Sequence, residues 1–203
     1  MIPFIAEPTF LAYNITPERG NKLTTLYNYG AEFDVYLTMT IDPNLDENKK
    51  YNVFRMSTYD YEAGKYGYRY PGLWWWKEDG LCPSFDYLKD HNFLTLCEKV
   101  KYGELIHVRM RHYPRNPGDN WADWIFEYCV NHVKCQTYYT YHSEWSYYSS
   151  SPKLWSQIHV HFSSPWGIPD AMPAMIHSFG VNIGSNKIDQ KSPFLTMCET
   201  SHF

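Results

Sequence analysis

Apolar and polar residues alternate along much of the chain. In residues 32–41 every second position is apolar, and the positions between them are polar or Tyr: the apolar set is Phe33, Val35, Leu37, Met39 and Ile41. A period of two is typical of a β-strand with one buried face. Further short strands are expected at residues 51–59, 73–77, 81–88, 104–112, 155–164 and 175–184, with turns rich in Gly, Pro and Asn between them. Residues 124–141 are predicted to form a hairpin that turns near Asn131 and His132.

No segment shows a convincing helical period, and the sequence contains no internal repeat or linker. Short strands at this spacing favour an all-β fold, a two-sheet antiparallel jelly-roll sandwich. We therefore expect one domain over residues 1–184, with a tail at residues 185–203 that packs on it or trails from it.

Composition and charge narrow the classes of partner. The net charge is −4 and no Lys/Arg cluster is present, so we expect no nucleic-acid partner. No apolar run approaches a membrane span. The opening residues lack the features of a signal peptide, so the protein is either cytosolic or begins at a mature end. The sequon Asn14-Ile15-Thr16 is compatible with the second alternative, and we adopt an extracellular, secreted location.

The cysteines offer two pairings and one spare thiol. Cys129 and Cys135 lie symmetrically about His132, where opposed hairpin positions approach disulfide distance. Cys82 with Cys97 is the other plausible pair. The alternative is five reduced, buried thiols.

Three segments resemble the laminin-G-like, or concanavalin-A-like, family of lectin and glucanase domains. They are NKLTTLYNYGAEFDV from Asn21, the glycine-, arginine- and proline-marked stretch from Gly64 to Trp74, and IHVHFSSPWGIPDAMPAMIHSFGVNIG from Ile158, and together they span residues 21 to 183. The resemblance implies a jelly-roll but no single function, because this fold hosts lectins, adhesion modules and glycosidases. Relatives often hold calcium through rim loops, and the carboxylates in or near loops here are Asp42, Asp46, Asp119 and Asp123.

The acidic pair of the glucanases is missing. Their motif is E-x-D-x-(x)-E, and the nearest match here, Glu32 with Asp34, lacks the second Glu and lies in the first predicted strand. Retaining hydrolysis needs two carboxyl groups close together. We therefore expect no glycosidase activity.

Aromatic residues are the main candidates for ligand contact, since they form 19% of the chain. Exposed rings stack on sugars, while nearby polar groups bind the hydroxyls. In a strand, Trp74 and Trp76 share one face, expected to be core, and Trp75 takes the other. The candidate ligand-binding residues are Trp75, Tyr66, Tyr68, Tyr70, Trp145 and Tyr147. The alternative is that these rings are core or half-buried edge positions.

His159 and His161 lie two apart on one predicted strand, so their imidazoles share a face and could bind one transition metal. Further candidate ligands are His107, His112, His142 and His177. The leading hypothesis is a non-catalytic domain that recognises a glycan, a glycoprotein or another protein partner through its aromatic surface. The alternatives are a metal-dependent enzyme, for example a small-molecule oxidase, that uses a face rich in His and Tyr, and a carrier of a pigment or another hydrophobic small molecule.

Overall fold

The chain folds into two stacked β-sheets. The computed structural model describes residues 10–29, 32–57, 69–85, 96–115, 123–132, 134–141, 155–163 and 170–183. Within these ranges the elements are strands, so the predicted all-β sandwich is confirmed. No helix in the described ranges is long and apolar enough to cross a membrane.

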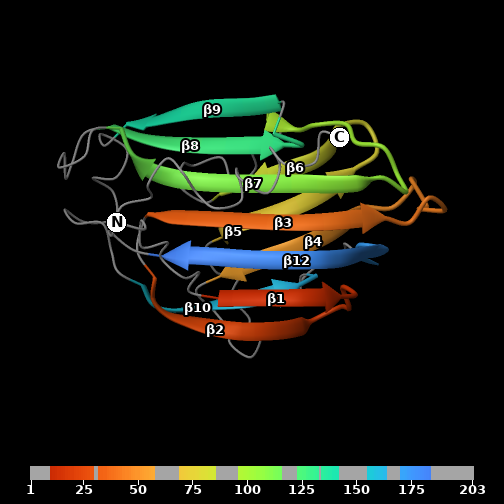
Figure 1. Ribbon diagram of the computed structural model, residues 1–203, viewed down its shortest axis with the longest axis horizontal. Coiled ribbons are helices and arrows are strands. Elements are labelled where there is room, and N and C mark those ends of the chain that lie inside the picture. The colour runs from red at the N-terminus through yellow and green to blue at the C-terminus, as the bar shows by residue number, and fades with distance from the viewer. Residues whose placement is uncertain are drawn as a thin grey trace, which may run out of the picture.

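Sheet A has six strands, and each neighbouring pair is antiparallel (Figure 1). Their order across the sheet is β1 (Phe10–Ile15), β12 (Ala174–Ile183), β3 (Phe33–Ile41), β7 (Leu105–Pro114), β8 (Asp123–Val130) and β9 (Lys134–Tyr141). The first and last strands of the chain's sandwich thus lie side by side, which is typical of a jelly-roll.

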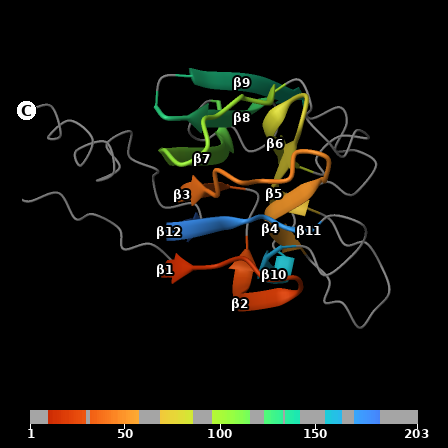
Figure 2. The same cartoon turned by 90° about the vertical axis from the view of Figure 1, so that its right-hand side faces the viewer.

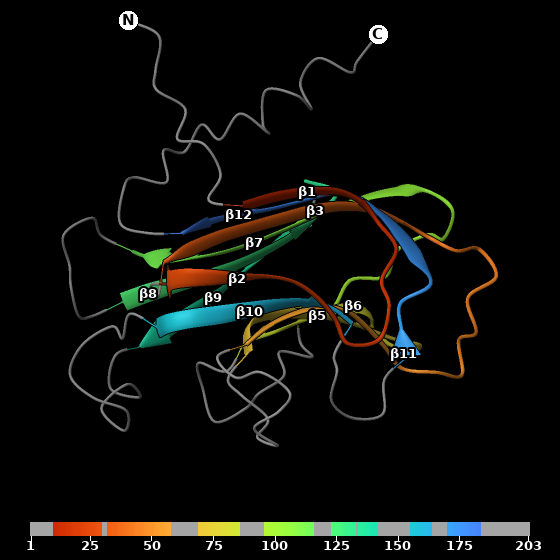
Figure 3. The same ribbon diagram turned by 90° about the horizontal axis from the view of Figure 1, so that it is seen from below.

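Sheet B lies behind sheet A. Figures 2 and 3 show the two sheets as separate layers that run in similar directions. The order in sheet B is β2 (Asn21–Tyr29), β10 (Trp155–Phe162), β4 (Tyr51–Ser57), β5 (Arg69–Trp76) and β6 (Gly80–Ser84). The two-residue strand β11 (Asp170–Ala171) pairs with β4 in parallel.

The core between the sheets is built largely from aromatic rings. Phe54 and Phe162 of sheet B pack against Phe179 of sheet A, with ring centroids 5.3 and 5.0 Å from it. The buried hydroxyl of Tyr128 donates a hydrogen bond to the carbonyl of Leu81 at 3.0 Å and so joins the two sheets. Part of the aromatic content of the sequence therefore serves the core.

The alternation that the sequence predicts is observed on β7 and β10. Ile106, Val108 and Met110 are buried core residues, as expected. On β10, Ile158, Val160 and Phe162 face the core. His159 and His161 therefore point to the outer side of sheet B, which agrees with their predicted shared face.

The three tryptophans alternate between the two faces as predicted, but the expectation that Trp74 and Trp76 face the core was wrong. Trp75 is 1% exposed and lies in the core against Tyr51 and Tyr102, with centroids 5.7 and 6.2 Å away. Trp74 and Trp76 are half-buried on the outer side of sheet B. With three identical residues in a row, hydrophobicity cannot choose the phase of the strand. The phase is set instead by the pairing of Trp75 with Tyr51 on β4.

Both predicted disulfides are present. Cys129 and Cys135 face each other on β8 and β9, and Cys82 of β6 is bonded to Cys97. The hairpin turns at Asn131 and His132, as predicted, and both residues have positive φ angles, of 52° and 55°. Asn tolerates this left-handed conformation better than most residues.

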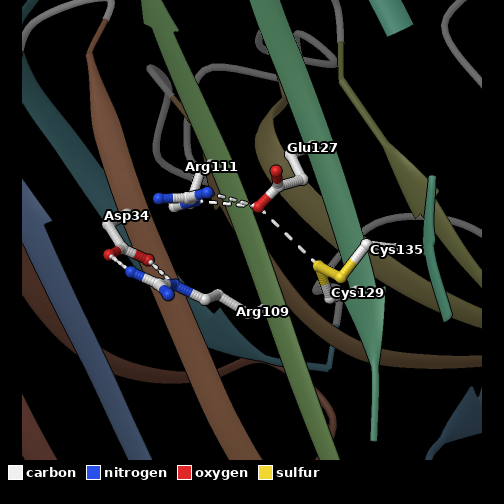
Figure 4. A network of polar contacts seen from close by, with 6 residues as sticks. All are labelled: Asp34, Arg109, Arg111, Glu127, Cys129 and Cys135. Carbon is white, nitrogen blue, oxygen red and sulfur yellow. Dashed lines mark hydrogen bonds and ion pairs between the residues drawn. A yellow bond between two sulfur atoms is a disulfide. The ribbon is translucent and has the colours of Figure 1, made fainter. Parts of the chain in front are cut away.

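Ion pairs lie on the outer side of sheet A (Figure 4). Arg109 donates to both carboxylate oxygens of Asp34, and Arg111 donates twice to Oε1 of Glu127. Beside them, Tyr36 lies against Gly180, and its burial, followed by the charges of Tyr13 and Asp34, raises the pKa of Tyr36 to about 12. On this side of the molecule each named guanidinium has a carboxylate partner.

Candidate functional site

The outer side of sheet B carries a cluster of polar and basic side chains, which we call the polar face. Register places its members on five neighbouring strands. The members are Lys22, Thr25, Arg55, Ser57, Trp74, Ser84, His159 and His161. Each member alternates along its strand with residues that face the core. Because successive side chains of a strand point to opposite faces, the polar residues gather on the outer side of the sheet.

The two histidines lie at the centre of the polar face. His161 is opposite Arg55 on β4 and Lys22 on β2, and a register shift precedes it on the β2 side. His159 is opposite Ser57, and its Nδ1 makes a 3.0 Å hydrogen bond with Oγ1 of Thr25. This bond fixes the orientation of the His159 ring. The His159 and His161 ring centroids are 6.4 Å apart.

The central side chains of the polar face are almost inaccessible to solvent. Arg55 is 2% exposed, His159 is 4% exposed and His161 is 2% exposed. Electrostatic interactions at such positions are stronger than in water because the local dielectric is low. Lys22, by contrast, is exposed at the margin of the same face.

Sheet A contains both basic and acidic residues, joined in ion pairs, whereas the charged residues on the main strands of sheet B are basic. The main strands of sheet B, β2, β10, β4, β5 and β6, contain three basic residues, Lys22, Arg55 and Arg69, and no Asp or Glu. Only the short β11 adds a carboxylate, Asp170, which binds Lys49 at 2.9 Å. A face with basic groups and no acidic ones on its own strands favours an anionic ligand.

Two indole rings border the polar face on β5. Nε1 of Trp74 donates to Oγ of Ser84 at 2.9 Å. Gly72 makes this contact feasible, because a Cβ at that position would lie only 2.8 Å from the same oxygen. Further along the strand, Nζ of Lys50 lies 4.6 Å above the ring of Trp76, within the range of a cation–π interaction.

Asn52 supplies a buried acceptor next to Trp74 in register. Its Nδ2 donates to the carbonyls of Phe54 and Leu73, each at 3.1 Å. Its Oδ1 is buried and has no hydrogen-bond partner among the residues that the structure describes. A buried polar atom without a partner costs free energy, so such atoms often mark places where a ligand or water binds.

The predicted ligand-binding residues fall into two groups. Trp75 lies in the core, so its predicted role as an exposed platform for a sugar is corrected. Tyr66, Tyr68, Trp145 and Tyr147 lie outside the described residues, and of Tyr70 only the backbone, in β5, is described. Their predicted roles stay predictions.

The predicted metal ligands do not converge within the described ranges. His112 is buried in the core, where its ring stacks on Trp124 at 4.7 Å, and His177 bonds to Oγ1 of Thr40. His107 lies beside His132, with centroids 5.3 Å apart. Among the residues described, no group of three or more His, Cys, Asp or Glu is placed to hold a metal. His142 and Asp119 lie outside that part of the chain.

The carboxylates proposed for calcium serve local turns where they are described. Oδ1 of Asp42 accepts hydrogen bonds from the backbone and side-chain amides of Asn44. Oδ1 of Asp46 does the same for Asn48. The predicted calcium site remains a prediction. The predicted transition-metal site at His159 and His161 also remains a prediction.

Sequence reasoning missed Arg55, Asn52 and Ser84. The available signal was a basic residue inside the strand segment YNVFRMS, whose other members are mostly apolar or small. The whole strand is buried on both sides, which hides the period of two.

Comparisons with known proteins give a fold and no family. No protein-family model matches the chain, and no curated protein matches its sequence. Among solved structures, the CBM40 of Ruminococcus gnavus IT-sialidase bound to α2,3-sialyllactose has a TM-score of 0.55 at 7% identity, covering 92% of this chain and 98% of that one. The endo-β-1,4-glucuronan lyase of Trichoderma reesei has a TM-score of 0.52 at 12% identity, covering 85% and 79%.

A third similar structure is much longer than this chain. The Trypanosoma rangeli sialidase in complex with 2,3-difluorosialic acid has a TM-score of 0.49 at 12% identity, and the match covers 78% of this chain but 21% of that chain. The two likenesses with TM-scores above 0.5 agree with the two antiparallel sheets in indicating a β-sandwich of the jelly-roll type. The narrower laminin-G-like resemblance stays a prediction.

Proposed function

We propose that this protein binds a carboxylate-bearing glycan at the polar face of sheet B, where Lys22, Trp74 and Trp76 reach solvent beside the nearly buried Arg55, His159 and His161. The observation that carries the proposal is the charge pattern of the face. Arg55, His159 and His161 adjoin one another across two strands, and the five main strands of the sheet contain no acidic residue. Non-catalytic recognition of a glycan or a protein partner through an aromatic surface was the leading hypothesis from the sequence, and we place its site on this face because Trp75 lies in the core.

The chemistry of the face suits an acidic sugar. A guanidinium matches a carboxylate in shape and charge, and an imidazole N–H adds a second donor. The half-buried rings of Trp74 and Trp76 offer apolar surface for the C–H faces of neighbouring sugars. Lys22, exposed at the opposite margin, adds a charge that steers an anion toward the face.

The two similar structures with TM-scores above 0.5 support this proposal. One is a module bound to sialyllactose, and the other is named a glucuronan lyase. Sialic acid and glucuronic acid both carry a carboxylate on the sugar ring. The likeness in fold makes a glycan a reasonable ligand class, and the basic face of this chain selects the acidic members of that class.

Matched pairs of glycans test the proposal. Each pair differs only in its acid group or acidic sugar: α2,3-sialyllactose against lactose, and β-1,4-oligoglucuronate against the corresponding cello-oligosaccharide. We expect binding to the acidic member of at least one pair, weaker at high salt because the attraction is screened. Equal binding to both members, or binding to neither, would contradict the proposal.

A second candidate function is cleavage of the same glycan by elimination. The observation that favours it is His159, whose ring is held by Thr25 on the same face as Arg55. An oriented imidazole is a suitable general base, and a cation beside a uronate carboxylate stabilises the charge that develops when the neighbouring C–H is deprotonated. Incubation with oligoglucuronate tests it: ultraviolet absorbance from an unsaturated product supports cleavage, and an unchanged substrate supports binding alone.

A further inference from the structure

The edge of sheet A carries an acceptor site for an N-linked glycan. The triplet Asn14-Ile15-Thr16 satisfies the sequon pattern, and it is the only such triplet in the chain. We infer that Asn14 is glycosylated and that the glycan covers the open edge of β1. This inference is independent of the glycan-binding face, which lies on the other sheet.

The conformation of Asn14 presents its side chain to solvent. Asn14 is exposed, and its φ angle of 53° lies in the left-handed region. Its neighbours Tyr13 and Ile15 are paired with Ser178 and Ile176 of β12. A glycan on Asn14 therefore leaves the pairing of β1 with its neighbour intact.

Thr16 completes the site on the same stretch. Thr16 is exposed, whereas the following residue, Pro17, is buried, so the chain returns to the sandwich directly after the triplet. Within the described part of the chain, the folded protein thus leaves both functional members of the sequon accessible.

The environment implied by the cysteines is the one in which this modification takes place. Two disulfides, Cys82–Cys97 and Cys129–Cys135, are formed within the described residues. Disulfides persist in oxidising compartments such as the lumen of the endoplasmic reticulum, which is also where asparagines are glycosylated in eukaryotes.

The position of Asn14 gives the glycan a function. Among the described strands β1 is the end strand of sheet A, and end strands present unpaired backbone groups that can recruit another chain. This edge also exposes two apolar side chains, Tyr13 at 62% and Leu11 at 37%. A bulky, hydrated glycan between this edge and solvent blocks edge-to-edge association.

The modification is a group transfer from an oligosaccharide linked to a polyprenyl diphosphate. Nδ2 of Asn14 forms a bond to the anomeric carbon of the donor, and the bond from that carbon to the diphosphate oxygen breaks. The polyprenyl diphosphate leaves with the bonding electron pair, and the amide loses one proton. A cellular transferase supplies the catalysis.

Secretion of the full chain from a eukaryotic cell, followed by intact-mass measurement, tests the inference. We expect a glycan mass that a peptide-N-glycosidase removes, leaving Asp at position 14. Because Pro17 follows the triplet and hinders transfer, modified and unmodified chains should appear together. Asn14→Gln and Thr16→Ala should abolish the mass, whereas the matched variant Thr16→Ser, which keeps the sequon, should retain it. A wild-type chain with no glycan at all would overturn the inference.

The shielding role has its own readout. Light scattering of the wild-type protein before and after enzymatic removal of the glycan should show increased association once β1 is uncovered. Unchanged association would overturn the shielding role while leaving the modification site in place. Neither result depends on whether the polar face of sheet B binds a glycan.

Discussion

The guanidinium of Arg109 on β7 binds the carboxylate of Asp34 on β3 through two hydrogen bonds, Nε to Oδ1 at 2.9 Å and Nη2 to Oδ2 at 2.5 Å (Figure 4). Their side chains are 13% and 3% exposed. The pair holds together two central strands of sheet A.

Substitution of one member of this ion pair should lower the stability of the folded protein. Asp34→Asn leaves the Arg109 charge in a largely buried position, which we expect to lower the free energy of unfolding by about 3–5 kcal/mol. Urea denaturation measures the change. Glu104→Gln is the control, because the Lys101–Glu104 pair is mostly exposed and such pairs contribute about 0–1 kcal/mol. Equal effects of the two substitutions would contradict this account of the pair.

Gly180 is required by the ring of Tyr36. A Cβ at position 180 would overlap the Tyr36 ring, which lies across the neighbouring strand. Gly180→Ala should therefore destabilise the protein by about 1–3 kcal/mol through overpacking. A double-mutant cycle checks the cause: in a Tyr36→Ala background the same substitution should cost little. If its cost is unchanged there, the ring is not the reason for the glycine.

His107 should make the protein less stable as the pH falls. Its burial, followed by the nearby charge of His132, lowers its pKa below the ordinary value of 6.5. The unfolded chain therefore takes up this proton first, and the free energy of unfolding declines from about pH 6.5 down to the lowered pKa, below which the loss is complete. At higher pH both states are neutral at this site, and no penalty remains.

His132→Asn isolates the part of this effect that comes from charge. Asn suits the left-handed backbone at position 132, so the turn should be preserved. The pKa of His107 should rise but stay below its ordinary value, because burial is the larger cause. Histidine titration by NMR measures it. A pKa that does not move on this substitution would contradict the coupling between the two rings.

Substitution of Trp75 should lower the stability of the fold, whereas substitution of Trp76 should mainly weaken glycan binding. Trp75→Ala removes a core ring and should cost about 3–5 kcal/mol. Trp76→Ala, on the half-buried outer side, should cost far less stability and should instead weaken binding of an acidic glycan. Chemical denaturation and a binding titration, run on both variants, check this division. Normal binding by Trp76→Ala would remove that ring from the site.

The sequence was sufficient to predict the strands with clear alternation. Residues 33–41 form β3, and the hairpin around Asn131 was placed correctly, because in both segments burial on one side of a sheet leaves a period of two. β1 was not predicted, since FLAYNI at an open edge carries a weak pattern. The Cys129–Cys135 disulfide was predicted from opposed hairpin positions, and Cys82–Cys97 was named as the other plausible pair.

The site was harder to predict than the fold. The alternation of His159 and His161 placed them correctly on one outer face. It could not show that Arg55, more than a hundred residues earlier in the chain, lies opposite His161, because that contact depends on which strands pair. The face of the three tryptophans was mispredicted for the same reason. The three residues are identical, so which of them faces the core depends on the pairing with a partner strand, and the local sequence does not reveal that pairing.

Isothermal titration calorimetry with β-1,4-oligoglucuronate and α2,3-sialyllactose tests the central claim most directly. Wild-type protein should bind at least one of these glycans, and His161→Gln should bind it about tenfold more weakly or worse, since losing a hydrogen bond to a charged group costs about 1.5–3 kcal/mol. The matched control His107→Asn, on sheet A, should bind like wild type. Wild-type affinity in His161→Gln, or an equal loss in both variants, would contradict a glycan site on the polar face of sheet B.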